Sequence, residues 1–166
     1  MGNSYLEEDM QIGRVWTFLL YAILFLFFII HPLKSHAEEE IPYAREFRHV
    51  EESFGLPHRI LVEIARKESN FGKALSECET AGITGDLGIM QLNPRYFDRA
   101  TACNPRDAIW TAGKYLRHLY DRFGSWYLAL VSYNWGETRL ASGARIPRSV
   151  QTYAHHILER VQDHVI

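Results

Sequence analysis

The stretch LVEIARKESNFG, residues 61–72, holds the clearest helical pattern of the chain and its most informative charged residue. One face of an α-helix collects positions i, i+3, i+4 and i+7, which here are Leu61, Ile64, Ala65 and Glu68. The spacing therefore predicts a helix whose apolar stripe ends in a carboxylate. Burial there would raise the pKa of the Glu68 carboxyl group toward neutrality, as a general acid requires. A glutamate that has emerged into solvent at the helix end fits this segment equally well.

Helical periodicity also precedes this stretch, in a segment that starts after Pro42. Its apolar residues are spaced by four, three and four positions and are Tyr43, Phe47, Val50 and Phe54. Gly55 ends this helix, and Pro57 suits the first turn of the helix that carries Glu68. Residues 72–88 show no period and are expected to form a loop, which leads into a short turn with the sequence GIMQLNP.

Three further helices are predicted toward the C-terminus. The sequence NPRD, residues 104–107, resembles a capped helix start, and Gly124 closes that helix. Ser125 can cap an apolar helix that stops at Gly136, and residues 139–147 form a loop. The last helix carries the stripe Val150, Tyr153, Ile157 and Val161. No segment alternates apolar and polar residues as a strand does, so we predict an all-α domain.

The N-terminal segment predicts export. Residues 15–30 contain no charged side chain, and as a helix they would reach about 24 Å, which is short for a hydrocarbon core of about 30 Å. We therefore expect residues 1–37 to be a signal peptide cleaved after Ala37, and residues 38–166 to be the mature domain in the periplasm. Residues 7–9 are acidic, which is atypical of a signal peptide, so a start at Met10 and a retained membrane anchor stay open.

Composition narrows the partners and the chemistry. Lys plus Arg number 18 against 20 Asp plus Glu, with a formal net charge of −2, so we expect no nucleic-acid partner. Cys78 and Cys103 are the two cysteines. They predict a disulfide in an oxidising compartment, worth roughly 3 kcal/mol, with two free buried thiols as the alternative. No Cys or His motif has metal-ligand spacing, so we expect no metal and no other cofactor. We also expect the protein to be a monomer.

Two further segments have compositions that suit ligand binding. Gly82, Gly85 and Gly88 are spaced as GxxGxxG, but no strand precedes them and no Lys-Ser/Thr follows, so a phosphate site is not supported. The segment SYNWG, residues 132–136, groups a phenol, an amide and an indole that suit sugar binding. Aromatic residues after an apolar helix are more often part of a core, which is the alternative for this segment.

Three short motifs in a fixed order resemble a known family. They are Glu68-Ser69, then GxMQ at residues 88–91, then YNxG at residues 133–136. In this order they are similar to those of the soluble lytic transglycosylase domain, a family related to goose-type lysozyme. The resemblance covers about residues 47–158, and Tyr153, after Ile146-Pro147, matches a fourth position of the family.

The resemblance implies a lysozyme-like helical domain with an active-site cleft. It implies cleavage of the β-1,4 bond between N-acetylmuramic acid and N-acetylglucosamine in peptidoglycan, with Glu68 as the catalytic acid and then the base, and with a 1,6-anhydro product. The substrate-binding residues that it implies are Ser69, Asp86, Gly88, Met90, Gln91, Tyr133, Asn134 and Tyr153. Among them, Met90 is expected to shape the wall of the cleft.

Other features concern the subgroup and the alternatives. Asp86 and the sequence CNP at residues 103–105 are similar to the small transglycosylases that accompany secretion systems, conjugation machines and pili, so components of such a machine are expected partners. The chain departs from the family pattern at Ser132, Trp135 and residues 149–151, which concerns the sugar subsites. A hydrolytic muramidase that uses Asp86 to position water, and a noncatalytic glycan-binding module, are the other functions considered.

Overall fold

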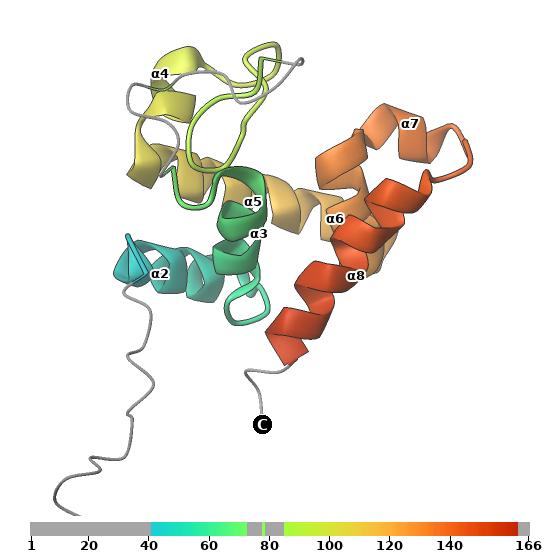
Figure 1. The fold of residues 1–166 in the computed structure, drawn as a ribbon, viewed down its shortest axis with the longest axis horizontal. Helices are drawn as coiled ribbons and strands as arrows, with labels where there is room; N and C mark the ends of the chain where they lie inside the picture. The colour runs from blue at the N-terminus through green and yellow to red at the C-terminus, as the bar shows by residue number, and fades with distance from the viewer. Residues whose placement is uncertain (1–40, 73–77, 79–84, 163–166) are drawn as a thin grey trace, which may run out of the picture. The chain divides into compact units, whose positions relative to one another are not determined.

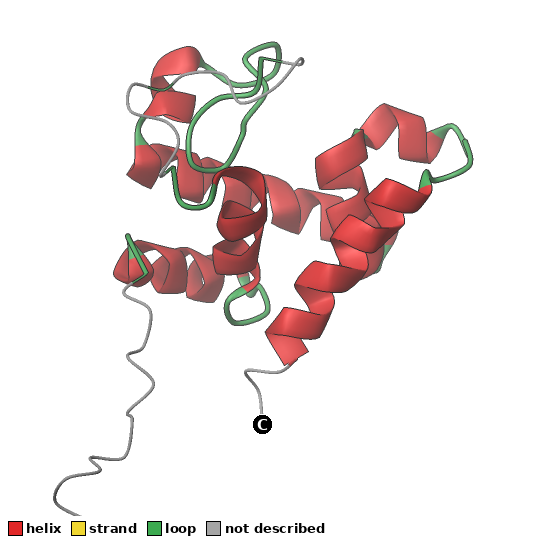
Figure 2. Ribbon diagram, in the orientation of Figure 1, coloured by secondary structure: helices red, strands yellow, loops and turns green. Residues whose placement is uncertain are grey.

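The computed structural model describes residues 41–72, 78 and 85–162, and over these residues the fold is helical (Figure 1). The helices are α2 (Ala44–Phe54), α3 (Ile60–Ser69), α4 (Arg99–Cys103), α5 (Pro105–Phe123), α6 (Trp126–Trp135), α7 (Glu137–Ala141) and α8 (Arg148–Gln162). Figure 2 draws no strand there, and β pairing is limited to one bridge between Leu87 and Leu92. The all-α prediction is therefore confirmed. The predicted signal peptide, residues 1–37, lies outside the described residues, within which no helix is long and apolar enough to span a membrane.

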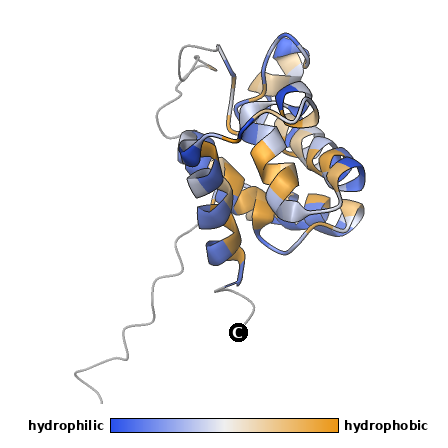
Figure 3. Ribbon diagram, turned by 90° about the vertical axis from the view of Figure 1, so that its right-hand side faces the viewer, coloured by the Kyte–Doolittle hydropathy of each residue, from blue (hydrophilic) through white to orange (hydrophobic). Residues whose placement is uncertain are grey.

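Helix α5 forms the centre of the domain and packs against α2, α3, α4 and α6, while α8 packs against α3 and α6. Figure 3 shows hydrophobic sides of the helices turned toward one another and hydrophilic sides turned outward. The largest fully buried side chains are Phe47, Ile60, Leu61, Ile64, Leu87, Met90, Leu92, Ile109, Leu116, Leu119, Leu130 and Ile157. Burial of such a side chain contributes about 1.5–3 kcal/mol, so this core fixes how α3 and α8 lie against each other.

Two buried glutamates, which the sequence analysis did not single out, link α3 to the helices on either side of it in the core, α2 and α8. Glu51 in α2 accepts hydrogen bonds from the backbone amides of Arg59 (2.8 Å) and Leu61 (3.0 Å) at the start of α3. Burial raises the pKa of Glu51 to about 6, because it outweighs the lowering by these hydrogen bonds. Glu63 in α3 is 2% exposed, and its Oε2 lies 2.5 Å from Nε of Arg160 in α8. Glu63 and Arg160 thus join α3 directly to α8.

Most predicted helix ends coincide with the observed ones. Gly55 and Gly124 follow α2 and α5 in the left-handed conformation, and Asn104 caps α5 by accepting hydrogen bonds from the amides of Arg106 (3.0 Å) and Asp107 (3.4 Å). Each of these residue types is typical of its position. Local sequence therefore determines these boundaries.

Four local expectations were wrong. Pro57 lies in a turn before α3, because Arg59 takes a left-handed conformation and the helix begins at Ile60. Tyr43 is 38% exposed at the left-handed N-cap of α2 and so does not belong to the apolar stripe. Ser125 stands at the N-cap of α6 but makes no side-chain capping hydrogen bond. The predicted loop over residues 139–147 begins with the end of α7, which at five residues is too short to show a period.

Candidate active site

Glu68 stands one residue before the end of α3 and meets Tyr153 of α8. The residue is partly buried, and its Oε1 accepts a hydrogen bond of 2.6 Å from the hydroxyl of Tyr153, which lies 85 residues further along the chain. Tyr153 is itself 6% exposed. The carboxylate therefore has not emerged fully into solvent at the helix end, and a buried phenol fixes the orientation of one of its oxygens.

The pKa of the Glu68 carboxyl group is raised above its ordinary value of 4.5, and burial is the largest cause. The negative charge of Asp86 raises this pKa further, whereas hydrogen bonds from Tyr153 and Asn134 and the charge of Lys67 lower it. Burial also raises the pKa of Tyr153 well above 10. Tyr153 therefore stays a neutral hydrogen-bond donor at any physiological pH, while Glu68 holds its proton more strongly than an exposed glutamate does.

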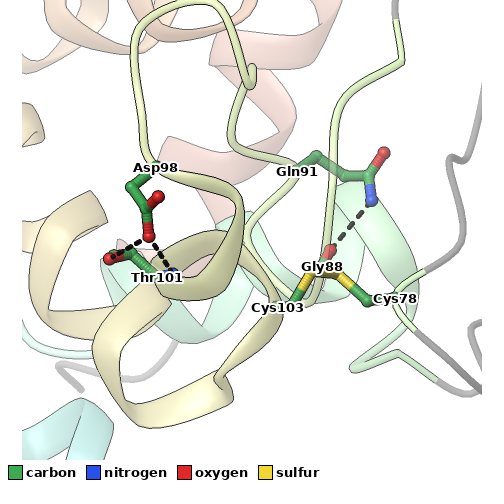
Figure 4. Close-up of a disulfide and its surroundings, with 6 residues drawn as sticks. All are labelled: Cys78, Gly88, Gln91, Asp98, Thr101 and Cys103. Atoms are coloured by element: carbon green, nitrogen blue, oxygen red, sulfur yellow. Dashed lines mark hydrogen bonds between the residues drawn. A yellow bond between two sulfur atoms is a disulfide. The ribbon is translucent and has the colours of Figure 1, made fainter.

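The GIMQ motif, residues 88–91, forms a tight loop closed by backbone hydrogen bonds of 2.9 Å in both directions between Leu87 and Leu92. Gly88 has a φ of +71°, and a Cβ at this position would lie 2.0 Å from the backbone oxygen of Ala102 in α4. Only glycine fits this close approach. Gln91 has a φ of +46°, and its Nε2 donates to the carbonyl oxygen of Gly88 at 2.8 Å (Figure 4). Gly88 and Gln91 thus determine the shape of the loop.

Two side chains of the other motifs hold this loop in place. The hydroxyl of Ser69, at the end of α3, donates to the carbonyl oxygen of Ile89 at 2.8 Å and accepts from the amide of Gly72 at 2.9 Å. The hydroxyl of Tyr133 in α6 donates to the carbonyl oxygen of Met90 at 2.8 Å. Met90 is fully buried. It therefore contributes a backbone carbonyl to this network, and its side chain belongs to the core and not to an exposed wall.

A disulfide supports the loop from the side of α4. Cys78 is bonded to Cys103, the last residue of α4, with the Cα atoms 5.2 Å apart (Figure 4). The side chain of Asp98 caps the same helix by accepting from the amide of Thr101 at 3.0 Å. Because Ala102 lies directly against Gly88, the disulfide and the cap fix the surface on which the GIMQ loop rests.

The structure sorts the nine predicted site residues into two groups. Glu68 interacts electrostatically or by hydrogen bonds with Tyr153, Asn134 and Asp86. The other five connect α3, the GIMQ loop, α4 and α6, and are Ser69, Gly88, Met90, Gln91 and Tyr133. Burial, followed by the charge of Glu68, raises the pKa of Tyr133 well above 10, so Tyr133 links the two groups. No cluster of His, Cys, Asp and Glu among the described residues could hold a metal ion.

Tyr115 in α5 also belongs to this region, although the sequence analysis did not select it. Its ring centroid lies 5.9 Å from that of Tyr133 and 5.4 Å from that of Phe97. Burial, followed by the charge of Glu137, raises the pKa of Tyr115 to about 12. Tyr115 therefore backs Tyr133 as an uncharged aromatic ring, and a single tyrosine within a helix of 19 residues gave no separate signal in the sequence.

A comparison with protein families identifies the domain that these helices form. The family model described as the Transglycosylase SLT domain matches residues 46–155, from the first turn of α2 to the middle of α8. The chain belongs to this family. It is a lytic transglycosylase of peptidoglycan, an enzyme that cleaves glycan strands as a lyase. A comparison with curated proteins finds no match for the chain.

One departure of this SLT domain from the family pattern has a visible cost. Ser132 in α6 is fully buried, and its hydroxyl finds no hydrogen-bond partner among the described residues. A buried hydroxyl without a partner is destabilising relative to a small apolar side chain. Ser132 lies in α6 directly before Tyr133, so the cost falls on the helix that carries Tyr133.

The raised pKa of Glu68 predicts that this residue lowers the stability of the SLT domain at neutral pH. A carboxyl group whose pKa is higher in the folded chain favours folding when protonated and opposes it once ionised. We expect Glu68→Gln to raise the melting temperature at pH 8, and we expect this gain to shrink as the pH falls toward 4.5. Thermal unfolding across this pH range measures the effect.

Glu52→Gln, at an exposed position of α2, is the matched control and should change the melting temperature little at either pH. A Glu68→Gln variant that melts below the wild type at pH 8 would contradict the expectation.

Proposed function

We propose that Glu68 carries out both proton transfers in cleavage of the β-1,4 bond between N-acetylmuramic acid and N-acetylglucosamine, with a 1,6-anhydromuramic end as the product. The observation that carries this proposal is a partly buried carboxyl group with a raised pKa, oriented by a buried tyrosine, within an SLT domain. A carboxyl group that holds its proton more strongly than an exposed glutamate is suited to protonate a leaving alkoxide.

In the first step Glu68 acts as the acid. The hydroxyl of Tyr153 donates to Oε1 of Glu68, so the proton of the neutral carboxyl group resides on Oε2, which transfers it to the glycosidic oxygen. The C1–O bond of the muramic acid breaks, and the carbonyl oxygen of its own N-acetyl group bonds to C1. This substrate-assisted route replaces the second enzyme carboxylate that most glycoside hydrolases use.

In the second step Glu68 acts as the base. Its carboxylate takes the proton of the C6 hydroxyl group while the C6 oxygen bonds to C1 and the N-acetyl oxygen leaves. The 1,6-anhydro ring is then closed, the carboxyl group is neutral again, and no water has been consumed. The same residue serves in both steps because the first step leaves it as a carboxylate, which its raised pKa makes a stronger base than an exposed glutamate.

The residues around Glu68 supply groups for holding the sugar. Asn134 is exposed and its amide interacts with Glu68, which suits it to contact the N-acetyl group. The hydroxyl of Tyr133 donates a hydrogen bond to the carbonyl oxygen of Met90, and Nε2 of Gln91 donates one to the carbonyl oxygen of Gly88. The oxygen atom of each side chain therefore stays an acceptor for hydroxyl or amide protons of the sugar. Asp86 adds a negative charge to the same region.

Replacement of Glu68 by glutamine should abolish cleavage of purified peptidoglycan, because an amide does not donate the required proton. The expected loss is about 10² to 10⁴-fold. Mass spectrometry of the muropeptides released by the wild type should show anhydro ends, lighter by about 18 mass units than the reducing ends formed by hydrolysis. Glu52→Gln is the control for the loss of one negative charge. Cleavage of peptidoglycan by the Glu68→Gln variant at the rate of the wild type would refute the role of Glu68.

A hydrolytic muramidase is the second candidate function, because the charge of Asp86 acts on Glu68 and a second carboxylate could position an attacking water. The products distinguish the two reactions. Reducing-end muramic acid as the main product, suppressed by Asp86→Asn, would overturn the transglycosylase mechanism and make Asp86 the residue that positions water.

Tyr153→Phe should alter the pH dependence of cleavage. The hydrogen bond from Tyr153 lowers the pKa of Glu68, so its loss raises that pKa. The basic limb of the kcat/KM profile, where the acid form is lost, should therefore move to higher pH, and kcat should fall by roughly tenfold because Oε1 is no longer oriented. Tyr127→Phe, on the part of α6 that contacts His155, is the control. An unchanged profile would exclude this role of Tyr153.

We also propose that the enzyme acts in the periplasm, where it opens the wall locally for a secretion, conjugation or pilus apparatus. The uncharged segment at residues 15–30, the disulfide and the similarity of the CNP segment to the small dedicated transglycosylases support this proposal. Expression in a bacterial host should yield periplasmic protein whose N-terminal sequence begins at Glu38. An intact N-terminus in the membrane fraction would favour a retained anchor instead.

A further inference from the structure

A surface cavity of about 380 Å³ lies where the chain enters α8, the helix that carries Tyr153. Figure 1 shows this segment as the loop between α7 and the N-terminal end of α8. The residues that line the cavity are Arg145, Ile146, Pro147, Arg148 and Gln151. Nε2 of Gln151 donates to the carbonyl oxygen of Ile146 at 2.9 Å, which ties the loop to the first turn of α8. The backbone around the cavity is therefore fixed independently of the two arginines.

The cavity is positively charged without a compensating acid. Arg145 and Arg148 are exposed, and their guanidinium groups form no ion pair or hydrogen bond with the part of the chain that the structure describes. Between Glu137 and Glu159 the sequence contains three arginines and no carboxylate. Glu137 already pairs with Arg122 and His118. Two unpaired guanidinium groups in a chain of net charge −2 mark a place suited to an anion.

The backbone adds to this preference. The amides of Val150 and Gln151 both donate to the carbonyl oxygen of Pro147, which sets the first turn of α8 directly beside the cavity. The start of a helix of 15 residues carries a partial positive charge. The two arginine side chains and the start of α8 therefore both favour a negatively charged ligand.

The cavity is displaced from the proposed reaction centre both along and around α8. Tyr153 follows Arg148 by five residues, which is about 7.5 Å along the helix axis at a rise of 1.5 Å per residue and about 140° around it. A substituent as long as a peptide stem can span this separation from a sugar held at Glu68. The sugar rings and acetamide groups of peptidoglycan are neutral. Its carboxylates lie on the peptide stems, and on the lactyl group of muramic acid once a stem has been removed.

We propose that Arg145 and Arg148 bind a carboxylate of the peptidoglycan strand and so hold the muramic acid residue in register with Glu68. This proposal rests on the function proposed above. An interaction remote from the breaking bond positions the substrate, and it acts equally on the ground state and the transition state. Its signature is therefore a change in KM with kcat preserved.

The variant that tests the proposal is Arg145→Gln with Arg148→Gln, and the chain offers a matched control. A second cavity, of about 310 Å³, is lined by Arg45 and Arg48 of α2, which have the same spacing of three residues, together with His49 and Glu52. Arg45→Gln with Arg48→Gln removes the same charge from the same fold. It therefore corrects for general attraction of a basic protein surface to an acidic cell wall.

Three forms of purified glycan strands separate the sources of the carboxylate. The first form keeps its peptide stems, the second has the stem carboxylates converted to amides, and the third has the stems removed so that the lactyl carboxylate is free. On the first form we expect the Arg145/Arg148 variant to show a KM about three- to tenfold higher, with kcat within twofold of the wild type. The control variant should match the wild type.

The difference between the Arg145/Arg148 variant and the wild type should disappear on the amidated strands. An effect that is largest on the strands without stems would assign the lactyl carboxylate as the ligand. An unchanged KM on all three forms, or an equal change in the Arg45/Arg48 variant, would overturn the proposal.

Binding in the absence of turnover separates this proposal from the mechanism. Titration calorimetry with Glu68→Gln protein and soluble stem-bearing fragments should show the same three- to tenfold loss of affinity when Arg145 and Arg148 are replaced. If the wild type releases reducing ends but this loss persists, the transglycosylase mechanism fails and the carboxylate site stands. If anhydro products form and the affinities are equal, the carboxylate site fails and the mechanism stands.

Discussion

The hydrogen bond between Tyr153 and Glu68 is the interaction on which the candidate active site depends. It joins two residues that are 85 positions apart in the sequence, so it forms only when α3 and α8 are packed in one defined way. The ion pair of Glu63 with Arg160 and the apolar core between these helices impose that packing. The buried charge of Glu63 is destabilising unless it is paired. A different packing of α3 against α8 would break this ion pair together with the hydrogen bond between Tyr153 and Glu68.

The motifs that identify the family turn out to bind mainly to one another. Ser69 contacts Ile89, Tyr133 contacts Met90, and Gln91 folds back on Gly88. These hydrogen bonds all use backbone carbonyl groups of the GIMQ loop. The side chains of Ser69, Gln91 and Tyr133 thus hold the loop through its backbone, which explains how three motifs distant in sequence meet at the GIMQ loop.

Much of the fold was predictable because its signals are local. Asn104, Gly55 and Gly124 mark helix ends through conformations that few other residues adopt, and the stripe of α8 follows a regular period. The position of Glu68 on an apolar face was also readable from spacing. The partners of Glu51 and Glu63 were not, because pairing across 10 and 97 residues leaves no local pattern. Helices α4 and α7 were not predicted, because a helix of five residues is too short to show a period.

The bond between Cys78 and Cys103 couples the assembly of the site to where the chain resides. Reduced, the chain lacks the tie between residue 78 and the end of α4, against which Gly88 packs. An exported chain of the kind proposed would acquire this tie only in an oxidising compartment, which is also where peptidoglycan is found. Maturation of the enzyme and access to its substrate would then coincide, and a precursor held in the reducing cytoplasm would carry a less rigid site.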